Sequence, residues 1–342
     1  MKYDTVLLKG DEDGINRAAK LLAEGELVAI PTETVYGLAA NALNREAVRR
    51  IFESKGRPQD NPLIVHISDI RELKPLVEDI PENAVKLAQK YWPGPLTMIF
   101  RRSSLVPEEV SAGLDTVAIR MPSHPVAREI ISRAGVPLAA PSANRSGSPS
   151  PTTAAHVMED MMGRIPAVVD GGESSVGVES TVLDLTRDEP RLLRPGGITP
   201  EQIRAVTGSL VIDKAVTGKL EEGAVAASPG MKYKHYAPKA RVILVKGSAD
   251  AFTSFVNSQK GEGVAAMCFD GEEKGLSVPF VTYGKRADSA EQAHRVFDAL
   301  RRLDEIEAKL VYCACPEPEG IGLAVYNRLL RSASFEVINL DE

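Results

Sequence analysis

Short, mainly apolar runs alternate with amphipathic stretches along the first two-thirds of the chain. Runs such as Leu27–Ile30 and Leu63–Ile67 predict buried strands. Apolar residues spaced three and four apart in Ile15–Glu24 and Arg45–Ser54 predict helices. The same patterns predict further strands over 5–8, 96–101, 116–120, 138–140, 167–170 and 180–184, and further helices over 83–92 and 125–134. Several connections are too short for a crossover helix, so we expect a mixed sheet.

The pattern changes after about residue 209. Residues 213–240 contain glycines and prolines with little periodicity, which is typical of a linker. From Arg241 onward strands alternate with helices, which predicts a small parallel, Rossmann-like sheet. We therefore expect an α/β protein with a first domain at 1–209, a linker at 210–240 and a second domain at 241–342.

Composition narrows the class of protein. The 342 residues are 43% hydrophobic and 26% charged, as in an ordinary globular protein of about two domains. The net charge of −6 argues against a protein that coats nucleic acid, although a local basic cleft stays possible. The sequence has neither a long apolar run nor a signal-peptide pattern, so we expect no membrane contact. Three cysteines cannot form a closed disulfide framework, which favours a cytoplasmic location.

Polar loops follow several of the predicted strands, where α/β proteins place ligand-binding residues. Thr32 and Thr34 follow the strand that ends at Ile30, and their hydroxyls share one side if the segment is extended. They would then be placed to bind a carboxylate or an amine. A turn capped by threonine explains the same residues equally well.

The next polar loop carries two cations, Lys55 and Arg57, on either side of a glycine. Arg57 offers a planar fork for phosphate and Lys55 a mobile point charge, and Asn61 and His66 add polar groups. A solvated basic loop and a structural histidine are the competing interpretations. The glycine-rich phosphate loop with Gly-Lys-Ser/Thr before a helix is absent from this segment.

Two later segments have a similar character. Arg120 ends a strand and precedes a proline, which suits carboxylate binding and an ordinary surface position about equally. The stretch 140–152, which includes Ser142 and Ser150, is dense in hydroxyl groups that can cradle phosphate oxygens. Flexible linkers share this composition, but regular prolines favour a fixed loop.

The linker contains an unusual concentration of lysine, tyrosine and histidine between prolines at 228–238. Its His235 and Tyr236 would suit a segment that folds over a nucleotide, with the base stacked on tyrosine. A linker packed on one domain is the alternative. The sequence lacks the nucleophile-elbow and His-Glu-x-x-His motifs, so positioning of phosphate-bearing substrates is the favoured chemistry.

Seven motifs in order resemble the YrdC-like domain of threonylcarbamoyl-AMP synthases. They are Pro31–Leu38, Lys55–Pro58, Asn61–His66, Trp92–Thr97, Ala140–Asn144, Gly177–Thr181 and Leu193–Gly196. The segment 228–238 and the domain after it are similar to the long form of these enzymes. The resemblance implies a twisted mixed sheet with a concave active-site cleft, joined by the linker to a Rossmann-like domain.

The resemblance also implies an activity. These enzymes convert L-threonine, bicarbonate or CO₂, and ATP with Mg²⁺ into threonylcarbamoyl-AMP and pyrophosphate. The product feeds N6-threonylcarbamoyladenosine synthesis on tRNA through a separate transferase complex, and the resemblance is compatible with a weak RNA contact. Carried over by motif position, the threonine site would comprise Thr34, His66, Arg120, Ala140 and Ser180. The nucleotide site would comprise Lys55, Arg57, Asn61, Thr116, Ser142, Ser150, Arg194, His235 and Tyr236, with Lys55 and Arg57 as the catalytic cations.

Two alternatives stay open at the level of sequence. YrdC-like proteins include members linked to RNA, so a double-stranded RNA-binding role is one alternative, although the acidic charge argues against it. Carbamoyl transfer to another acceptor is the second. The acylphosphatase and zinc-finger regions of such relatives are missing from this sequence.

Overall fold

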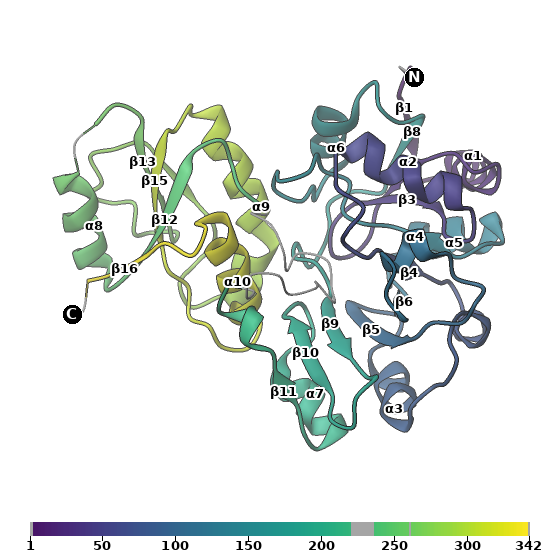
Figure 1. Cartoon of the computed structure of the whole chain (residues 1–342). Helices are drawn as coiled ribbons and strands as arrows, with labels where there is room; N and C mark the ends of the chain where they lie inside the picture. The colour runs from purple at the N-terminus through teal and green to yellow at the C-terminus, as the bar shows by residue number, and fades with distance from the viewer. Residues whose placement is uncertain (1–2, 220–235, 260, 341–342) are drawn as a thin grey trace. The chain divides into compact units, whose positions relative to one another are not determined.

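The computed structural model describes residues 3–219, 236–259 and 261–340 and divides the chain into two compact units (Figure 1). Of the described residues, the first unit holds 3–146 and 150–216. The second holds 147–149, 217–219, 236–259 and 261–340. Each unit has a β-sheet of its own.

The first unit is built on an 11-stranded sheet with the order β1-β8-β2-β3-β7-β4-β6-β5-β9-β10-β11. Its strands are β1 (Val6–Lys9), β2 (Val28–Ile30), β3 (Gly37–Asn41), β4 (Ile64–His66), β5 (Leu96–Arg101), β6 (Thr116–Arg120), β7 (Leu138–Ala139), β8 (Ala167–Asp170), β9 (Thr181–Asp184), β10 (Arg191–Arg194) and β11 (Val211–Ile212). Strand β4 runs parallel to β6 and antiparallel to β7, so the predicted mixed sheet is confirmed.

The helices of this unit follow local sequence signals, such as capping side chains and glycines, at several of their ends. They are α1 (Glu12–Ala23), α2 (Arg45–Lys55), α3 (Glu82–Tyr91), α4 (Glu108–Ser111), α5 (Pro125–Ala134), α6 (Ala154–Met161) and α7 (Pro200–Thr207). The side chain of Asn44 caps the start of α2 by accepting hydrogen bonds from two backbone amides of the first turn. Gly56 ends α2 in the left-handed conformation, with φ of 63°, directly after Lys55. The helix end therefore fixes where the predicted cationic loop begins.

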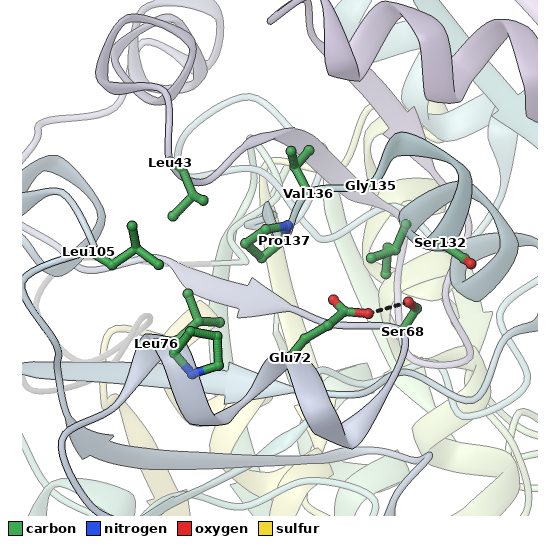
Figure 2. A pocket seen from close by; sticks show the side chains of 11 residues that line it. Leu43, Ser68, Glu72, Leu76, Leu105, Ser132, Gly135, Val136 and Pro137 are labelled. Carbon is green, nitrogen blue, oxygen red and sulfur yellow. Dashed lines mark hydrogen bonds between the residues drawn. The ribbon is translucent and has the colours of Figure 1, made fainter.

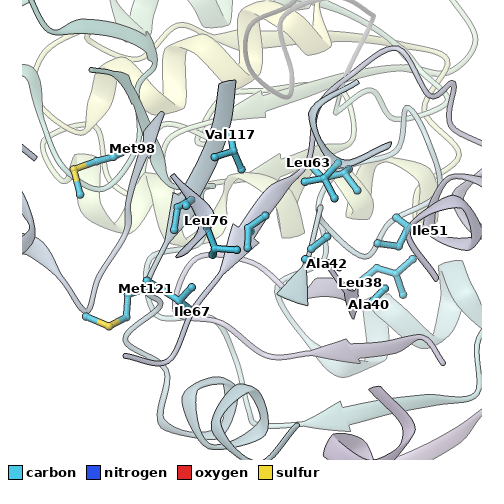
Figure 3. Packing of buried hydrophobic residues seen from close by; sticks show 14 of the residues in the cluster. Leu38, Ala40, Ala42, Ile51, Leu63, Ile67, Leu76, Met98, Val117 and Met121 are labelled. Carbon is cyan, nitrogen blue, oxygen red and sulfur yellow. The ribbon is translucent and has the colours of Figure 1, made fainter. Parts of the chain in front are cut away.

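Hydrophobic residues pack on both faces of this sheet. On one face, α2 and α3 cover the main core, part of which Figure 3 shows around Leu38, Ile51 and Val117. On the other face, α1 and α5 cover the β1-β8-β2-β3-β7 half of the sheet. The β4-β6-β5-β9-β10 half of that second face has a smaller apolar cluster of Ile64, Ile99, Ala118, Val182, Leu193 and Ala215. Polar candidate residues lie on this same half.

The second unit has a five-stranded parallel sheet with the order β14-β13-β15-β12-β16. Its strands are β12 (Arg241–Lys246), β13 (Val264–Cys268), β14 (Phe280–Thr282), β15 (Leu310–Ala314) and β16 (Val337–Asn339). Its helices are α8 (Ala249–Ser258), α9 (Ser289–Glu305) and α10 (Gly322–Ser332), with α8 on one side of the sheet and α9 and α10 on the other (Figure 1). The predicted Rossmann-like sheet is confirmed, and β16 extends it beyond the expected elements.

The structure also bears on the cysteines and on the possibility of a membrane-spanning helix. All three cysteines are free. None of the described helices combines the length and the apolar character needed to cross a bilayer.

Candidate functional site

Strand pairing gathers predicted site residues that are far apart in sequence. His66 at the end of β4 lies opposite Arg120 at the end of β6, and Arg120 lies opposite Thr97 of β5. On the outer sides, Leu138 of β7 pairs with His66, and Leu96 pairs with Thr181 of β9. Ser180, which precedes β9, therefore meets the same edge, whereas Ala140, which follows the antiparallel β7, lies beside Ile64, two residues back from it. Because side chains alternate along a strand, His66, Arg120 and Thr97 share the face that carries the smaller apolar cluster.

Arg120 is a buried cation at this edge, with only 3% of its surface exposed. Its Nε donates to the carbonyl oxygen of Gly94 at 3.3 Å, and its Nη1 donates to Thr34 Oγ1 at 2.8 Å. Its Nη2 lies 2.8 Å from Glu33 Oε1. A guanidinium fixed on three sides presents its remaining N–H groups in one orientation, which suits two-pronged recognition of a carboxylate.

Glu33 is a buried acid that the sequence analysis did not single out. Burial raises the pKa of its carboxyl, but the charge of Arg120, together with hydrogen bonding from Arg120 and from backbone amides, outweighs that effect and keeps the pKa below its ordinary value. The pair is therefore ionised. The signal in the sequence is an acid placed between two threonines directly after a buried strand.

His66 is neutral at physiological pH. Burial, followed by repulsion from Arg120, lowers its pKa to about 3. Its Nδ1 lies 3.2 Å from the carbonyl oxygen of Ile64, and the two atoms form a hydrogen bond in the tautomer that is protonated at Nδ1. The imidazole thus contributes a polar but uncharged surface beside Arg120.

A second arginine meets the other side of this edge. Arg194 Nε donates to the carbonyl oxygen of Ser180 at 3.0 Å, and its Nη2 donates to Ser180 Oγ at 3.2 Å. Thr97 Oγ1 shares a hydrogen bond of 2.7 Å with the same hydroxyl. Gly196 permits this approach, because a Cβ at that position would lie 2.3 Å from the backbone nitrogen of Thr181. Thr97 is a further residue that the sequence analysis did not list, since inside a strand it looks like ordinary sheet.

Lys55 is buried and ties down the loop after β7. Its Nζ donates to the carbonyl oxygens of Ser142 and Asn144, the latter at 2.5 Å. Burial, and then repulsion from Arg57, holds the pKa of Lys55 well below its ordinary value. The sequence predicted a mobile phosphate-binding cation; here the ammonium is held by backbone carbonyls because the loop folds over the end of α2. Its predicted role toward ATP stays a prediction.

The loop that begins at Ala140 is also tied to the strands around it. A β-bridge joins Ser142 to Gly37, the first residue of β3. Further along, Ser150 Oγ donates to Glu179 Oε1 at 2.5 Å. The structure thus brings Ser142 and Ser150 to the neighbourhood of Lys55 on one side and of Ser180 on the other.

Another group of predicted residues lies toward the opposite end of β6. Four residues at about 3.3 Å each place Thr116 about 13 Å from Arg120 along this strand, on the same face. The parallel register of β4 with β6 leads Asn61 toward Thr116. Arg57 Nη2 donates to the carbonyl oxygen of Asn61 at 3.2 Å. The side-chain amide of Asn61 is buried and makes no hydrogen bond to the described residues, so it has capacity for a polar ligand.

The apolar cluster lies between these two ends. Ala118 separates Thr116 from Arg120, with Ile64 and Ile99 as its neighbours on the flanking strands. One face of the sheet therefore offers a charged end, a short apolar floor and a second polar end. That sequence of surfaces suits an elongated ligand with an amino-acid part and a nucleotide part.

The two predicted linker residues have different outcomes. His235 lies outside the described residues. Tyr236 belongs to the second unit, where it is 5% exposed, with its ring 5.1 Å from the ring of Phe297 and the guanidinium of Arg328 5.7 Å away. The contacts of Tyr236 agree with the alternative interpretation of the linker, in which it packs on one domain. Its contact with a nucleotide stays a prediction.

A separate pocket of about 280 Å³ lies elsewhere on the first unit (Figure 2). It is lined mainly by apolar side chains such as Leu43, Leu76 and Leu105. Its polar pair is satisfied internally, because Ser68 Oγ donates to Glu72 Oε1 at 2.6 Å. None of its lining residues is among the candidate site residues, and its apolar lining does not match strongly polar substrates.

Within the described part of the chain, no group of three or more His, Cys, Asp and Glu residues is arranged to hold a metal.

Two family models match successive parts of the chain. Residues 20–196 match the model described as telomere recombination, which covers Sua5, YciO and YrdC. Residues 198–334 match the C-terminal domain of threonylcarbamoyl-AMP synthase. The chain belongs to the Sua5 family of threonylcarbamoyl-AMP synthases. Membership in the Sua5 family confirms the predicted resemblance and the predicted enzyme class, a nucleotidyltransferase that makes an adenylate.

Relatives in the Sua5 family match nearly the whole chain. The threonylcarbamoyl-AMP synthase of Pyrococcus abyssi is 47% identical over 339 residues, which cover 96% of this chain and 97% of the relative. That of Bacillus subtilis is 47% identical over 336 residues, covering 97% and 96%. A crystal structure of P. abyssi Sua5 complexed with L-threonine has a TM-score of 0.92 at 44% identity, covering 98% of this chain and 99% of that one. The function is thus threonylcarbamoyl-AMP synthesis, in preference to RNA binding or carbamoyl transfer to another acceptor.

Proposed function

We propose that this face of the sheet binds L-threonine at the Arg120 end and ATP toward the Asn61 and Thr116 end, and joins them through CO₂ or bicarbonate. The observation that carries the proposal is the guanidinium of Arg120, buried and held by Thr34 at one end of β6, with an apolar floor leading to a second polar end. The P. abyssi structure with L-threonine supports a threonine site in the family.

At the threonine end, Arg120 would receive the substrate carboxylate. Thr34 and Ser180 supply hydroxyls, and the neutral His66 lies beside the guanidinium. The amide of Ala140 donates to the carbonyl oxygen of Ile64 at 3.0 Å, and Ala140 would line the side of the threonine site. A neutral imidazole and a guanidinium already paired with the carboxylate of Glu33 suit a zwitterionic amino acid better than a dianion.

At the nucleotide end, cations and hydroxyls would surround the phosphates. Arg57 supplies a guanidinium group at this end, and Arg194, held on Ser180 at the Arg120 edge, would reach the phosphates from there. Lys55 fixes the Ser142 loop, and Ser150 extends that loop. Asn61 and Thr116 supply an amide and a hydroxyl. These are donor groups for phosphate and ribose oxygens, so we expect Mg²⁺ to enter as part of the ATP complex, held by phosphates and water. His235 and Tyr236 are the remaining residues that the family resemblance assigns to the nucleotide site.

The chemistry follows from these positions. The ammonium group of threonine first loses a proton to solvent, and the free amine then adds to CO₂ and releases a second proton to form a carbamate. A carbamate oxygen attacks the α-phosphorus of ATP, and pyrophosphate leaves. Negative charge grows on the phosphate oxygens during the attack, and fixed cations such as Arg57 and Arg194 stabilise it without reorganisation. A carbamate hydrolyses readily in water, so holding it on a largely buried surface protects it.

The product implies a partner. Threonylcarbamoyl-AMP is an activated acyl compound, so we expect a separate transferase complex to pass its threonylcarbamoyl group to tRNA. This division leaves the synthase without a need for more than a weak RNA contact. We expect the reaction to take place in the cytoplasm, in line with the three free cysteines.

Pyrophosphate release tests the proposal. The complete mixture of ATP, Mg²⁺, bicarbonate and L-threonine is expected to release pyrophosphate, whereas mixtures with L-serine or without an amino acid are expected to release little. Arg57→Ala should abolish turnover. Arg71→Ala, at an arginine whose side chain is 86% exposed, is the matched control and should retain wild-type turnover. Release that does not depend on threonine would overturn the proposal.

A further inference from the structure

Glu33 is buried in the threonine end without a role in the reaction described above. Only 5% of its surface is exposed, and its Oε1 lies 2.8 Å from Arg120 Nη2. Its backbone is fixed as well, because its carbonyl oxygen accepts a hydrogen bond of 2.7 Å from the amide of Val176. The carboxylate is therefore held in place from both the side chain and the main chain.

We propose that Glu33 determines specificity by balancing the charge of Arg120, so that the site favours amino acids carrying an ammonium group over simple carboxylates. The inference rests on the proposed threonine site. It concerns a residue that the sequence motifs did not single out for binding.

Charge balance carries the argument. Arg120 and Glu33 together are neutral, and both are nearly excluded from water. A zwitterionic amino acid adds no net charge to this buried pair. A carboxylate without an ammonium adds a full negative charge close to Glu33, where weak screening makes like-charge repulsion costly. An arginine without its carboxylate partner would instead attract any small anion.

The contacts of Arg120 allow the electrostatic role of Glu33 to be distinguished from a role in orienting the guanidinium. Arg120 is anchored by Gly94 and Thr34 as well as by Glu33. Glu33→Gln keeps an oxygen that can accept from Nη2 and removes only the negative charge. The substitution therefore changes the electrostatic balance while leaving the guanidinium oriented.

The test compares L-threonine with 3-hydroxybutyrate, which is threonine without its amino group. Inhibition of threonine-dependent pyrophosphate release gives the Ki of 3-hydroxybutyrate, and the same assay gives the KM of threonine. In Glu33→Gln we expect the ratio of Ki to KM to fall about tenfold, with 3-hydroxybutyrate binding more tightly than to the wild type. A merely structural role for Glu33 would weaken both ligands together.

Two further variants complete the design. Glu109→Gln removes a carboxylate that is also 2.8 Å from an arginine, Arg49, but lies outside the site, and it should leave the ratio unchanged. Glu33→Asp keeps the charge, so it should retain the wild-type preference even where Glu33→Gln folds poorly. A ratio within twofold of wild type in Glu33→Gln, or an altered preference in Glu33→Asp, would overturn the inference.

The outcome for Arg120 distinguishes this inference from the proposed function. If Arg120→Ala leaves the KM of threonine unchanged, the proposed threonine site is wrong whatever Glu33 does. If Arg120→Ala raises that KM strongly while Glu33→Gln leaves the ratio unchanged, only the role of Glu33 is wrong.

Discussion

His66 makes the stability of the first unit depend on pH, and the dependence can be worked out from the structure. Its pKa is about 3 in the folded protein against an ordinary value of 6.5, because the ring is buried beside Arg120. Below pH 6.5 the histidine binds a proton in the unfolded chain, whereas in the folded chain it stays unprotonated. The contribution to stability is therefore complete above pH 6.5 and falls as the pH drops toward 3.

The size of the effect follows from the two pKa values. Between pH 7.5 and 5.0, a histidine with these values loses about 2 kcal/mol of folding free energy. His66→Gln removes the titrating group and keeps a polar side chain. Between pH 7.5 and 5.0 the free energy of unfolding should therefore decrease in both proteins, but the decrease in His66→Gln should be smaller than that in the wild type by about 2 kcal/mol.

Urea unfolding measured at both pH values provides the test. Trp92, the single tryptophan of the chain, is buried in the first unit and donates to the carbonyl oxygen of Leu96 at 2.7 Å, so its fluorescence reports on that unit. His124→Gln is the matched control. Burial also lowers the pKa of His124, but its ring is only partly buried, so a smaller difference is expected. Equal losses of stability in wild type and His66→Gln would refute the reasoning about His66.

The remaining predictions concern the two sides of the site. Gly196→Ala would place a Cβ 2.5 Å from the carbonyl oxygen of Glu179, so we expect it to lower the free energy of unfolding, followed by Trp92 fluorescence, by about 1–3 kcal/mol and to reduce pyrophosphate release. Lys55→Met keeps the length of the side chain but leaves the carbonyl oxygens of Ser142 and Asn144 without their ammonium partner. Initial rates should show a KM for ATP raised about tenfold or more and a KM for threonine changed little; the reverse pattern would contradict the assignment of this loop to the nucleotide.

Local patterns were sufficient to locate the elements on which the site is built. Apolar runs predicted strands that end next to His66 and Arg120, and apolar spacing predicted the helix that ends next to Lys55. These features depend on neighbours in sequence, since strand and helix periodicity act over a few residues. The second unit was anticipated for the same reason, down to the bounds of α8.

Contacts between distant segments were beyond this reasoning. Nothing in the neighbourhood of His66 reveals that it pairs with Arg120, because strand order depends on packing of the whole sheet. The hydroxyl of Thr97 becomes part of the site only through its contact with Ser180. Glu33 is recognisable as a charge partner only once Arg120 lies beside it. Lys55 was expected to extend toward phosphate, whereas a loop nearly ninety residues later supplies its acceptors.

The strand register described for His66, Arg120 and Thr97 has a consequence for when activity can arise during folding. The threonine end exists only after β4, β6, β5 and β9 have paired, and these strands come from segments between residues 64 and 184. Contacts of such long sequence separation form late and together, since each closes a large loop. A nascent or partly unfolded chain therefore lacks the complete threonine end. Synthesis of a reactive adenylate is in this way restricted to molecules that have finished folding.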